Sequence, residues 1–329
     1  MADIFGVRVA PDLSILDSLI IICSDAGGQT DPAVLFMEQD YVVIWADVVA
    51  GARASALKAL RVDPHGGVIG PAITFGTGNS LTDMAYDSNR CLVVWSNEHD
   101  AIYGRFLNEQ AMPEDTVFMI DRLTGSEGSP QLDYGGVHYL IVWSDFDSAG
   151  IDREIYGRLV STNGAIVSDR IQITDEGGHQ ACPSVNFNGI NYLVAWIEAS
   201  GAIKGRLIET SGQPASTIFQ VCDTFSHARD GIDIASGLSN HLVVWSEWRS
   251  DFDIYGNCDI SIEISEYRPL PEQRSWHAEI IGSPLPYDIY GHWEIFDVSG
   301  RKIPFESIDK GIYFLKNSEG EVHKIVKVR

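Results

Sequence analysis

Two short segments combine acidic and aromatic side chains in a pattern that suits ligand binding. Carboxylates accept hydrogen bonds from sugar hydroxyls, and flat aromatic rings offer stacking surfaces. The sequence therefore predicts a ligand-binding set made of Phe146, Asp147, Asp152, Trp248, Arg249 and Asp251.

The aspartates of these segments suggest a second kind of chemistry. Hard oxygen ligands suit calcium, although the spacing is not that of an EF-hand loop. A calcium site is predicted from Asp145, Asp147, Asp152, Asp251 and Asp253, and no other cofactor is expected.

A glycoside hydrolase is the third possibility, because such enzymes need two carboxylates about 5–10 Å apart. The loops hold many acids, but nothing in the sequence selects a pair, so no catalytic residue is predicted. The chain also lacks a nucleophile motif, a phosphate loop and a dinucleotide fingerprint. Binding is therefore favoured over catalysis.

Charge and composition limit the partners. The formal net charge is −23, and residues 266–329 are almost neutral, so the acidity belongs to residues 1–265. A surface this negative repels phosphate backbones, which argues against nucleic acid. No apolar run reaches the roughly 18 residues of a membrane-spanning helix. The five cysteines form no CxxC pair, which argues against a zinc site.

A repeat of about 50 residues determines the predicted architecture. An aliphatic run, then Trp, a small or apolar residue and an acid or amide occurs five times, with the tryptophans at Trp45, Trp95, Trp143, Trp196 and Trp245. A second phrase follows roughly ten residues later, as in Ile102-Tyr103-Gly104-Arg105, and has an extra copy at Ile4-Phe5-Gly6-Val7. Repeats of this length are typical of propeller blades.

Each unit is predicted to form four short strands, A to D. In the fourth unit these are residues 183–188, 191–198, 202–209 and 217–222. The sequence thus predicts an all-β fold: a β-propeller of about five four-stranded blades, with the five tryptophans packed between blades rather than contacting ligand. We expect the glycine of the second phrase to lie where a Cβ atom has no room.

Ring closure is expected to join the two ends of the repeat region. Strands near residues 4–9 and 17–23 would complete the fifth blade with strands near 231–235 and 240–247. Residues 254–256 then form a spare strand, so an alternative is that residues 1–23 belong to a sixth blade.

The B–C and D–A loops of a blade emerge on one face, and here that face is acidic. The acid or amide two positions after each Trp is predicted to cap backbone N–H groups of its own loop. This set is Asp47, Asn97, Asp145, Glu198 and Glu247.

The last residues resemble a known export signal. The segments at 295–302, 310–315 and 324–329 are similar to the C-terminal sorting domain of the type IX secretion system, a small β-sandwich that directs cargo across the outer membrane. The resemblance implies roles in sorting for Gly300, Arg301, Gly311, Tyr313, Lys324, Lys327 and Arg329. The Asn-Pro phrase that usually opens such a domain is not evident. The alternative is a plain β-hairpin cap on the propeller.

The repeats also resemble bacterial surface propeller repeats that carry the Trp-Ser-Asp and Ile-Tyr-Gly-Arg pairing, for which no reliable activity follows. The expected division is a propeller at 1–265, a linker at 266–287 and a sorting-like β-sandwich tail at 288–329. Residues 1–8 do not read as a signal peptide. The signal is then missing from this chain, or the true start lies upstream, or the protein stays in the cytoplasm.

The functional prediction is a secreted or cell-surface binding module. Its acidic loop face would bind an extracellular glycan or protein, and its tail would engage the secretion machinery. The alternatives are a secreted glycoside hydrolase-like enzyme and a calcium-stabilised structural adhesin.

Overall fold

The structure, a computed structural model, falls into two compact units, Met1–Ile262 and Glu263–Arg329, which are described separately. It describes residues 2–10, 12, 14–17, 19–48, 54–78, 80–97, 101–125, 129–147, 150–222, 231–237, 241–248, 252–257, 278–281, 293–297, 302–303, 311–317 and 322–327. Among these residues no helix is long and apolar enough to cross a membrane.

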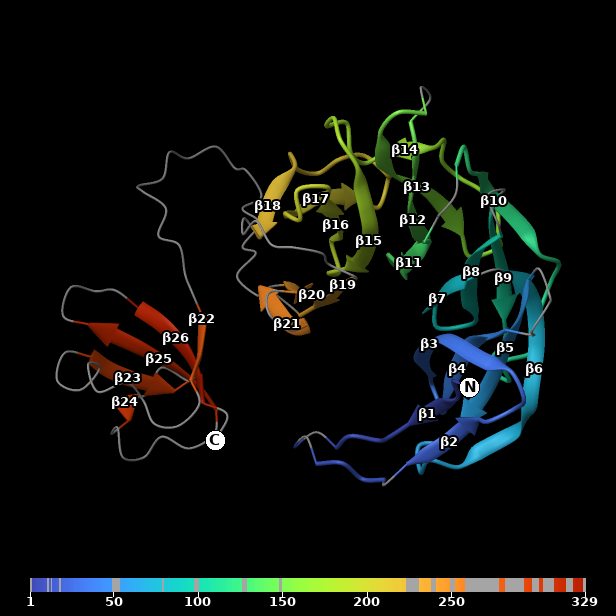
Figure 1. Cartoon of the computed structure of the whole chain (residues 1–329), viewed down its shortest axis with the longest axis horizontal. Coiled ribbons are helices and arrows are strands. Elements are labelled where there is room, and N and C mark those ends of the chain that lie inside the picture. The colour runs from blue at the N-terminus through green and yellow to red at the C-terminus, as the bar shows by residue number, and fades with distance from the viewer. Residues whose placement is uncertain are drawn as a thin grey trace. The chain divides into compact units, whose positions relative to one another are not determined.

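The first unit is a five-bladed β-propeller, which confirms the predicted fold class (Figure 1). Four blades are antiparallel sheets of four strands in chain order. Blade 1 contains β3 (Gly28–Met37), β4 (Asp40–Val48), β5 (Ser55–Val62) and β6 (Val68–Gly78). Blade 2 contains β7 (Ser80–Tyr86), β8 (Cys91–Asn97), β9 (Ala101–Leu107) and β10 (Phe118–Arg122).

Blades 3 and 4 repeat this pattern, and the described part of blade 5 has three strands. Blade 3 contains β11 (Gln131–Tyr134), β12 (His138–Phe146), β13 (Arg153–Ser161) and β14 (Ile171–Gln172). Blade 4 contains β15 (Gln180–Phe187), β16 (Asn191–Glu198), β17 (Ile203–Glu209) and β18 (Phe219–Cys222), close to the four predicted strands. Blade 5 contains β19 (Ile232–Ser236), β20 (His241–Trp248) and β21 (Phe252–Asn257).

The N-terminal strands form a small sheet of their own. β1 (Ile4–Gly6) pairs with β2 (Ile20–Cys23), and neither pairs with blade 5 in the described residues. The expected pairing between the two ends of the repeat region is therefore not seen. Instead, Ile4 and Cys23 pack with Trp45 against blade 1, where a preceding blade would lie.

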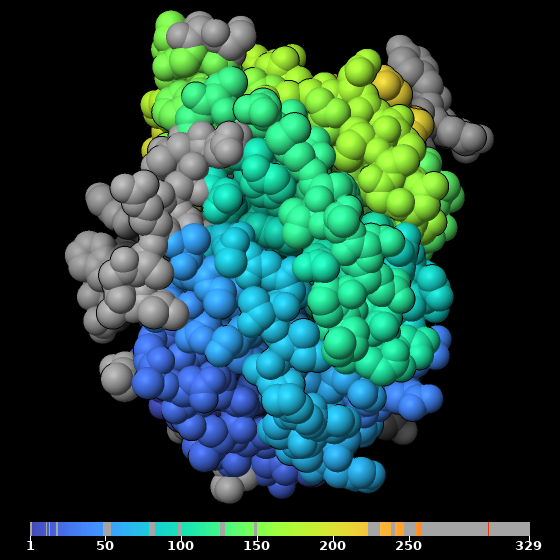
Figure 2. Space-filling view, turned by 90° about the vertical axis from the view of Figure 1, so that its right-hand side faces the viewer, coloured from blue at the N-terminus to red at the C-terminus, as the bar shows by residue number. Residues whose placement is uncertain are grey.

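The core lies between blades, as predicted. All five repeat tryptophans are buried. Each apolar cluster joins one blade to the next: Trp143, for example, packs with Leu92 and Ile102 of the preceding blade. Figure 2 shows the outer surface of the first four blades, stacked in chain order. A blade therefore gains its burial from its neighbours, as expected for a repeat architecture.

Glycine in the second phrase is required by packing, as predicted. A Cβ atom on Gly104 would lie 2.9 Å from the Phe118 ring, and one on Gly205 would lie 3.0 Å from the Phe219 ring. Both rings come from the D strand of the same blade, so the aromatic side chain occupies the space that Cβ would need. Blade 1 has Ala59 opposite Ile73 instead, without an aromatic ring.

The second unit contains one five-stranded sheet in the order β22-β26-β25-β23-β24. Its strands are β22 (Ala278–Ile281), β23 (Trp293–Asp297), β24 (Lys302–Ile303), β25 (Gly311–Asn317) and β26 (Val322–Lys327). β22 lies inside the range predicted as a linker and pairs in parallel with β26. Of the predicted sorting residues, Gly311 and Tyr313 lie on β25 and Lys324 and Lys327 on β26, whereas Gly300, Arg301 and Arg329 lie outside the described residues.

Candidate functional site

The acid after the repeat tryptophan belongs to a polar network at the end of the blade. In blade 1, Asp47 accepts a hydrogen bond from Gln29 Nε2 at 3.0 Å and an ion pair from Lys58 Nζ at 2.5 Å. Lys58 also reaches Asp25 in the preceding loop, at 3.5 Å. Burial alone would raise the pKa of Asp47, but Lys58 and Gln29 hold it below its ordinary value.

Blade 4 repeats this network with a longer acid. Glu198 accepts hydrogen bonds from Trp196 Nε1 at 2.7 Å and from Gln180 Nε2 at 3.4 Å. Lys204 lies between Glu198, at 3.7 Å, and Glu176 of the preceding loop. In both blades the network connects the A, B and C strands to the loop that enters the blade.

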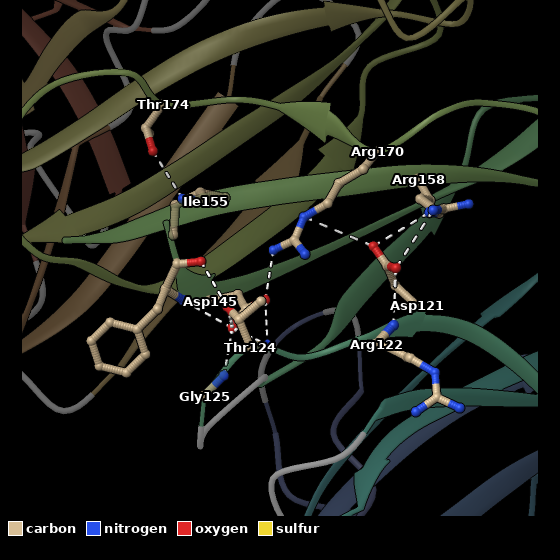
Figure 3. A network of polar contacts seen from close by, with 10 residues as sticks. Asp121, Arg122, Thr124, Gly125, Asp145, Ile155, Arg158, Arg170 and Thr174 are labelled. Carbon is tan, nitrogen blue, oxygen red and sulfur yellow. Dashed lines mark hydrogen bonds and ion pairs between the residues drawn. The ribbon is translucent and has the colours of Figure 1, made fainter. Parts of the chain in front are cut away.

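Blade 3 uses a different arrangement around Asp145 (Figure 3). The carboxylate accepts hydrogen bonds from the backbone N–H groups of Thr124 and Gly125 at 3.0 and 3.1 Å, and from its neighbour Phe146 at 2.8 Å. Arg170 Nη2 completes the set at 2.6 Å. The predicted cap is therefore present, but it mainly holds the loop that enters the blade.

Arg170 fills the outer part of the joint between blades 2 and 3. Its guanidinium lies 3.7 Å from the centre of the Tyr156 ring and 5.7 Å from that of Trp143. It also lies 3.8 Å from Asp121 of β10, which pairs at 3.3 Å with Arg158 (Figure 3). Two arginines and two aspartates thus balance their charges in this joint.

The predicted ligand-binding set is only partly described. The Phe146 ring is engaged within the protein by Arg153, at 5.2 Å, and by His179, at 6.5 Å. Asp147 accepts a hydrogen bond from the N–H of Ile151 at 2.8 Å, within its own loop. Asp152 lies in the same loop, where its carbonyl accepts a hydrogen bond from the Asp147 N–H. Arg249 and Asp251 lie outside the described residues, and only the backbones of Trp248 and Asp253 are described.

The calcium set stays a prediction. Among the described residues, no group of three or more His, Cys, Asp or Glu side chains is placed to hold a metal ion. The oxygens of Asp145 are already bonded to Thr124, Gly125 and Arg170. A rise in melting temperature with calcium that is lost in D147N and D152N would support a site in this loop.

A pocket lies at the joint between blades 1 and 2. It has a volume of about 410 Å³, in the usual range of small-molecule sites. Trp95 and Tyr103 stack at 6.3 Å, and Phe75 meets Trp95 edge-on at 5.9 Å. The remaining lining comes from Thr74, Gly76, Thr77, Asn97, Arg105 and Val117.

This pocket occupies the place that Arg170 fills in blade 3. Strand register shows the equivalence. Phe118 pairs with Gly104, and Ile171 pairs with Gly157, the equivalent glycine of blade 3. The residues just before them, Val117 and Arg170, are therefore counterparts. Asn97 is likewise the counterpart of Asp145, two residues after the tryptophan. Blade 2 therefore keeps the aromatic walls of the joint and lacks the side chain that fills it.

Glycine keeps the floor of the pocket open. Gly76 pairs with Leu57 of blade 1, and Asp121 pairs with Ile102, the equivalent residue of blade 2. Gly76 is therefore the counterpart of Asp121. A Cβ atom on Gly76 would lie 3.2 Å from the Trp95 ring. The third charged group of the blade 3 joint is therefore also absent here.

Two further acids lie on the innermost strands. Asp83 of β7 accepts a hydrogen bond from the Leu132 N–H of β11 at 2.9 Å. Asp133 of β11 accepts one from the Phe187 N–H of β15 at 2.7 Å. Burial, opposed by these hydrogen bonds, raises the pKa of Asp83 to about 7 and also raises the pKa of Asp133. They join neighbouring blades near the propeller axis.

Sequence reasoning did not find the blade 2 pocket. It placed Trp95 in the core, and Trp95 is indeed buried, yet its ring also forms a wall of the pocket. The available signal was the exception within the repeat: Asn97 is the only amide in a set of acids.

The sequence matches no protein-family model and no curated protein. Solved structures with a similar fold include the α-L-arabinofuranosidase Arb93A from Fusarium graminearum, with a TM-score of 0.50, 11% identity, and coverage of 70% of this chain and 77% of that one. A thermostable family-43 glycoside hydrolase has a TM-score of 0.44, 12% identity, and coverage of 75% and 96%. TolB from Acinetobacter baumannii has a TM-score of 0.41, 12% identity, and coverage of 75% and 59%. At these identities the likeness shows the propeller fold alone.

Proposed function

We propose that this propeller is a glycan-binding module whose ligand enters the pocket between blades 1 and 2. The observation that supports this most directly is the stacked pair of Trp95 and Tyr103, which forms one wall of an open pocket beside polar side chains. A sugar ring has an apolar face for aromatic stacking and hydroxyls for hydrogen bonding. Asn97 and the two threonines supply donors and acceptors for those hydroxyls.

The pocket differs from the predicted acidic loop face in position and in charge. On the loop face, Phe146 and Asp147 are engaged by neighbouring residues. In the pocket, Asn97 makes the second position after the tryptophan uncharged. A ligand in the pocket therefore meets polar side chains that form no ion pair among the described residues.

The test is a calorimetric titration of the whole chain with a panel of neutral and acidic oligosaccharides. Tyr103→Leu removes the stacking surface and should weaken binding about tenfold, since 1.4 kcal/mol corresponds to a factor of ten. Phe36→Leu is the matched control, because Phe36 is an exposed ring in β3 outside the pocket. Absence of binding to every oligosaccharide, or equal loss in both variants, would refute the proposed function.

Glycoside hydrolysis is a second candidate, favoured by two carboxyls, Asp83 and Asp133, on the neighbouring inner strands β7 and β11. A carboxyl with a pKa of about 7 can act as a general acid near neutral pH. Asp133, on the next inner strand, is a second carboxyl whose charge interacts with Asp83. Hydrolysis by the wild type that is abolished in D83N, with an unchanged melting temperature, would support this function. An inactive wild type on all substrates that it binds would exclude it.

We also propose that the tail directs export to the cell surface. The support is the resemblance of the segments at 295–302, 310–315 and 324–329 to the type IX sorting domain. These segments overlap the strands β23, β25 and β26. A reporter protein fused to residues 263–329 should reach the surface of a bacterium that has this secretion system. Retention of the reporter in the periplasm would contradict the proposal.

A further inference from the structure

The charge of the blade 2 pocket differs from that of its counterpart in blade 3. In blade 3, Arg158 and Arg170 are balanced by Asp121 and Asp145. Arg105 is the counterpart of Arg158, because Arg105 pairs with Val93 and Arg158 pairs with Ile141 in the same register. At the joint between blades 1 and 2, the other three charged positions are occupied by Gly76 of blade 1 and by Val117 and Asn97 of blade 2. Among the described residues that line this pocket, Arg105 is thus the only charged one.

Arg105 has an unused donor. Its Nη1 donates to the carbonyl of Phe75 at 2.8 Å and its Nη2 to the carbonyl of Asp115 at 3.1 Å. Its Nε is buried and has no hydrogen-bond partner in the described residues. The two neighbouring acids, Glu114 and Asp115, pair with Arg90 instead. A buried, unsatisfied donor is unfavourable and calls for an acceptor.

The other blades show which acceptor is missing. In blade 4 the equivalent Arg206 Nε donates to the carbonyl of Ser216 at 3.2 Å. In blade 3, Arg158 Nε also lacks a hydrogen bond among the described residues, but it forms an ion pair with the Asp121 carboxylate at 3.3 Å. At the joint between blades 1 and 2, Gly76 of β6 takes the position that Asp121 of β10 has at the next joint, so the pocket has space where the next joint has a carboxylate.

We propose that the pocket selects an acidic sugar, a uronate, whose carboxylate occupies the place above Gly76 and pairs with Arg105. This deepens the proposed glycan-binding function and depends on it. The sugar ring lies against Tyr103 and Trp95, and Asn97 binds a ring hydroxyl. A carboxylate accepts a charge-assisted hydrogen bond from the free Nε–H of Arg105 more strongly than a neutral hydroxymethyl group does. The net charge of −23 opposes this ligand, but charges beyond about 8 Å are largely screened at physiological salt.

The repeat itself supplies a variant that should fold. Blade 5 has Asn257 at the position of Arg105, and its Nδ2 donates to the Val221 carbonyl at 2.8 Å, as Arg105 Nη1 donates to Phe75. Arg105→Asn should therefore keep the contact between blades while removing the charge. Arg206→Asn makes the same change in blade 4, away from the pocket, and is the matched control.

The experiment compares oligosaccharides of galacturonic, glucuronic and mannuronic acid with their methyl esters, which differ only in charge. We expect the wild type and Arg206→Asn to bind at least one free acid tenfold or more tightly than its ester, and to lose this preference in high salt. Arg105→Asn should bind acid and ester equally, with a melting temperature close to that of Arg206→Asn.

Three outcomes would overturn the proposal. Equal affinity of the wild type for acid and ester would show that the pocket does not recognise the negative charge of the carboxylate. A preference that persists in Arg105→Asn would place the recognition elsewhere. Binding of neutral oligosaccharides without any binding of uronates would refute the uronate while leaving the glycan-binding function intact. If no oligosaccharide of any kind binds, the proposed function fails as well.

Discussion

Asp47 and Glu198 occupy equivalent positions in their blades. Glu198 is longer by one methylene group, and this difference decides whether the acid reaches the indole N–H of the buried tryptophan. Glu198 reaches the indole N–H of Trp196 at 2.7 Å. Asp47 is shorter, and the indole N–H of Trp45 is buried without a partner in the described residues. We therefore expect Asp47→Glu to stabilise the protein.

The magnitude follows from the partners. A buried N–H without an acceptor costs about 1–3 kcal/mol, and a new hydrogen bond contributes a net 0.5–1.5 kcal/mol or so. A glutamate at position 47 should keep the contacts that Asp47 makes with Gln29 and Lys58. In blade 4, Glu198 contacts Gln180 and Lys204, which are the counterparts of these two residues. We expect Asp47→Glu to add about 1 kcal/mol to the free energy of unfolding, and Glu198→Asp to remove about 1–3 kcal/mol.

The assay is urea unfolding followed by tryptophan fluorescence, with thermal melting as a second measure. Each kcal/mol should shift the midpoint by about 2 °C in a domain of this size. Asp145→Glu is the control: Trp143 also lacks a partner, but the Asp145 carboxylate already holds Thr124, so lengthening it should destabilise the protein. If Glu198→Asp melted like the wild type, the indole hydrogen bond would not contribute as argued.

Three further changes test other joints. Arg170→Val removes the cation over Tyr156 and leaves the buried Asp145 without its counter-ion, so it should lower the free energy of unfolding by about 3 kcal/mol in urea; a neutral effect would contradict this. Because the pKa of Asp83 is about 7 in the folded chain and lower when unfolded, stability should fall by at most about 4 kcal/mol as pH rises from 4 to 7, and D83N should flatten this slope. Gly104→Ala should cost about 1–3 kcal/mol by melting, because Cβ meets the Phe118 ring; an unchanged midpoint would show that the ring moves freely.

The fold was predictable because its signal is repeated. Five tryptophans at similar intervals, each after an aliphatic run, define the B strands, and all five are buried between blades. In blade 4 the predicted B strand, 191–198, coincides with β16. The start of the A strand was less certain: β15 begins at Gln180 rather than at residue 183, because a bulge at Cys182 lets the strand continue past Pro183.

The site was less predictable, because it depends on what neighbouring blades place together. Acid and aromatic residues adjacent in sequence, such as Phe146 and Asp147, suggested a binding loop. The pocket instead combines β6 of one blade with β8 and β9 of the next, so its residues, from Thr74 to Val117, are spread over two repeats. A single sequence shows that Asn97 is unusual, but only the structure shows that it lines one pocket with Gly76 of blade 1 and Arg105 of its own blade.

The clusters between blades have a consequence for how the protein unfolds. Blades 1 to 4 each share one apolar cluster with the element before and another with the blade after, whereas the described part of blade 5 shares one only, with blade 4. Stability in such an array is set by nearest neighbours. Amide protons of β19–β21 should therefore exchange through local opening well before those of β8 or β12. A ligand held between blades 1 and 2 would slow exchange on both sides of that joint, so hydrogen exchange could locate the ligand without a crystal.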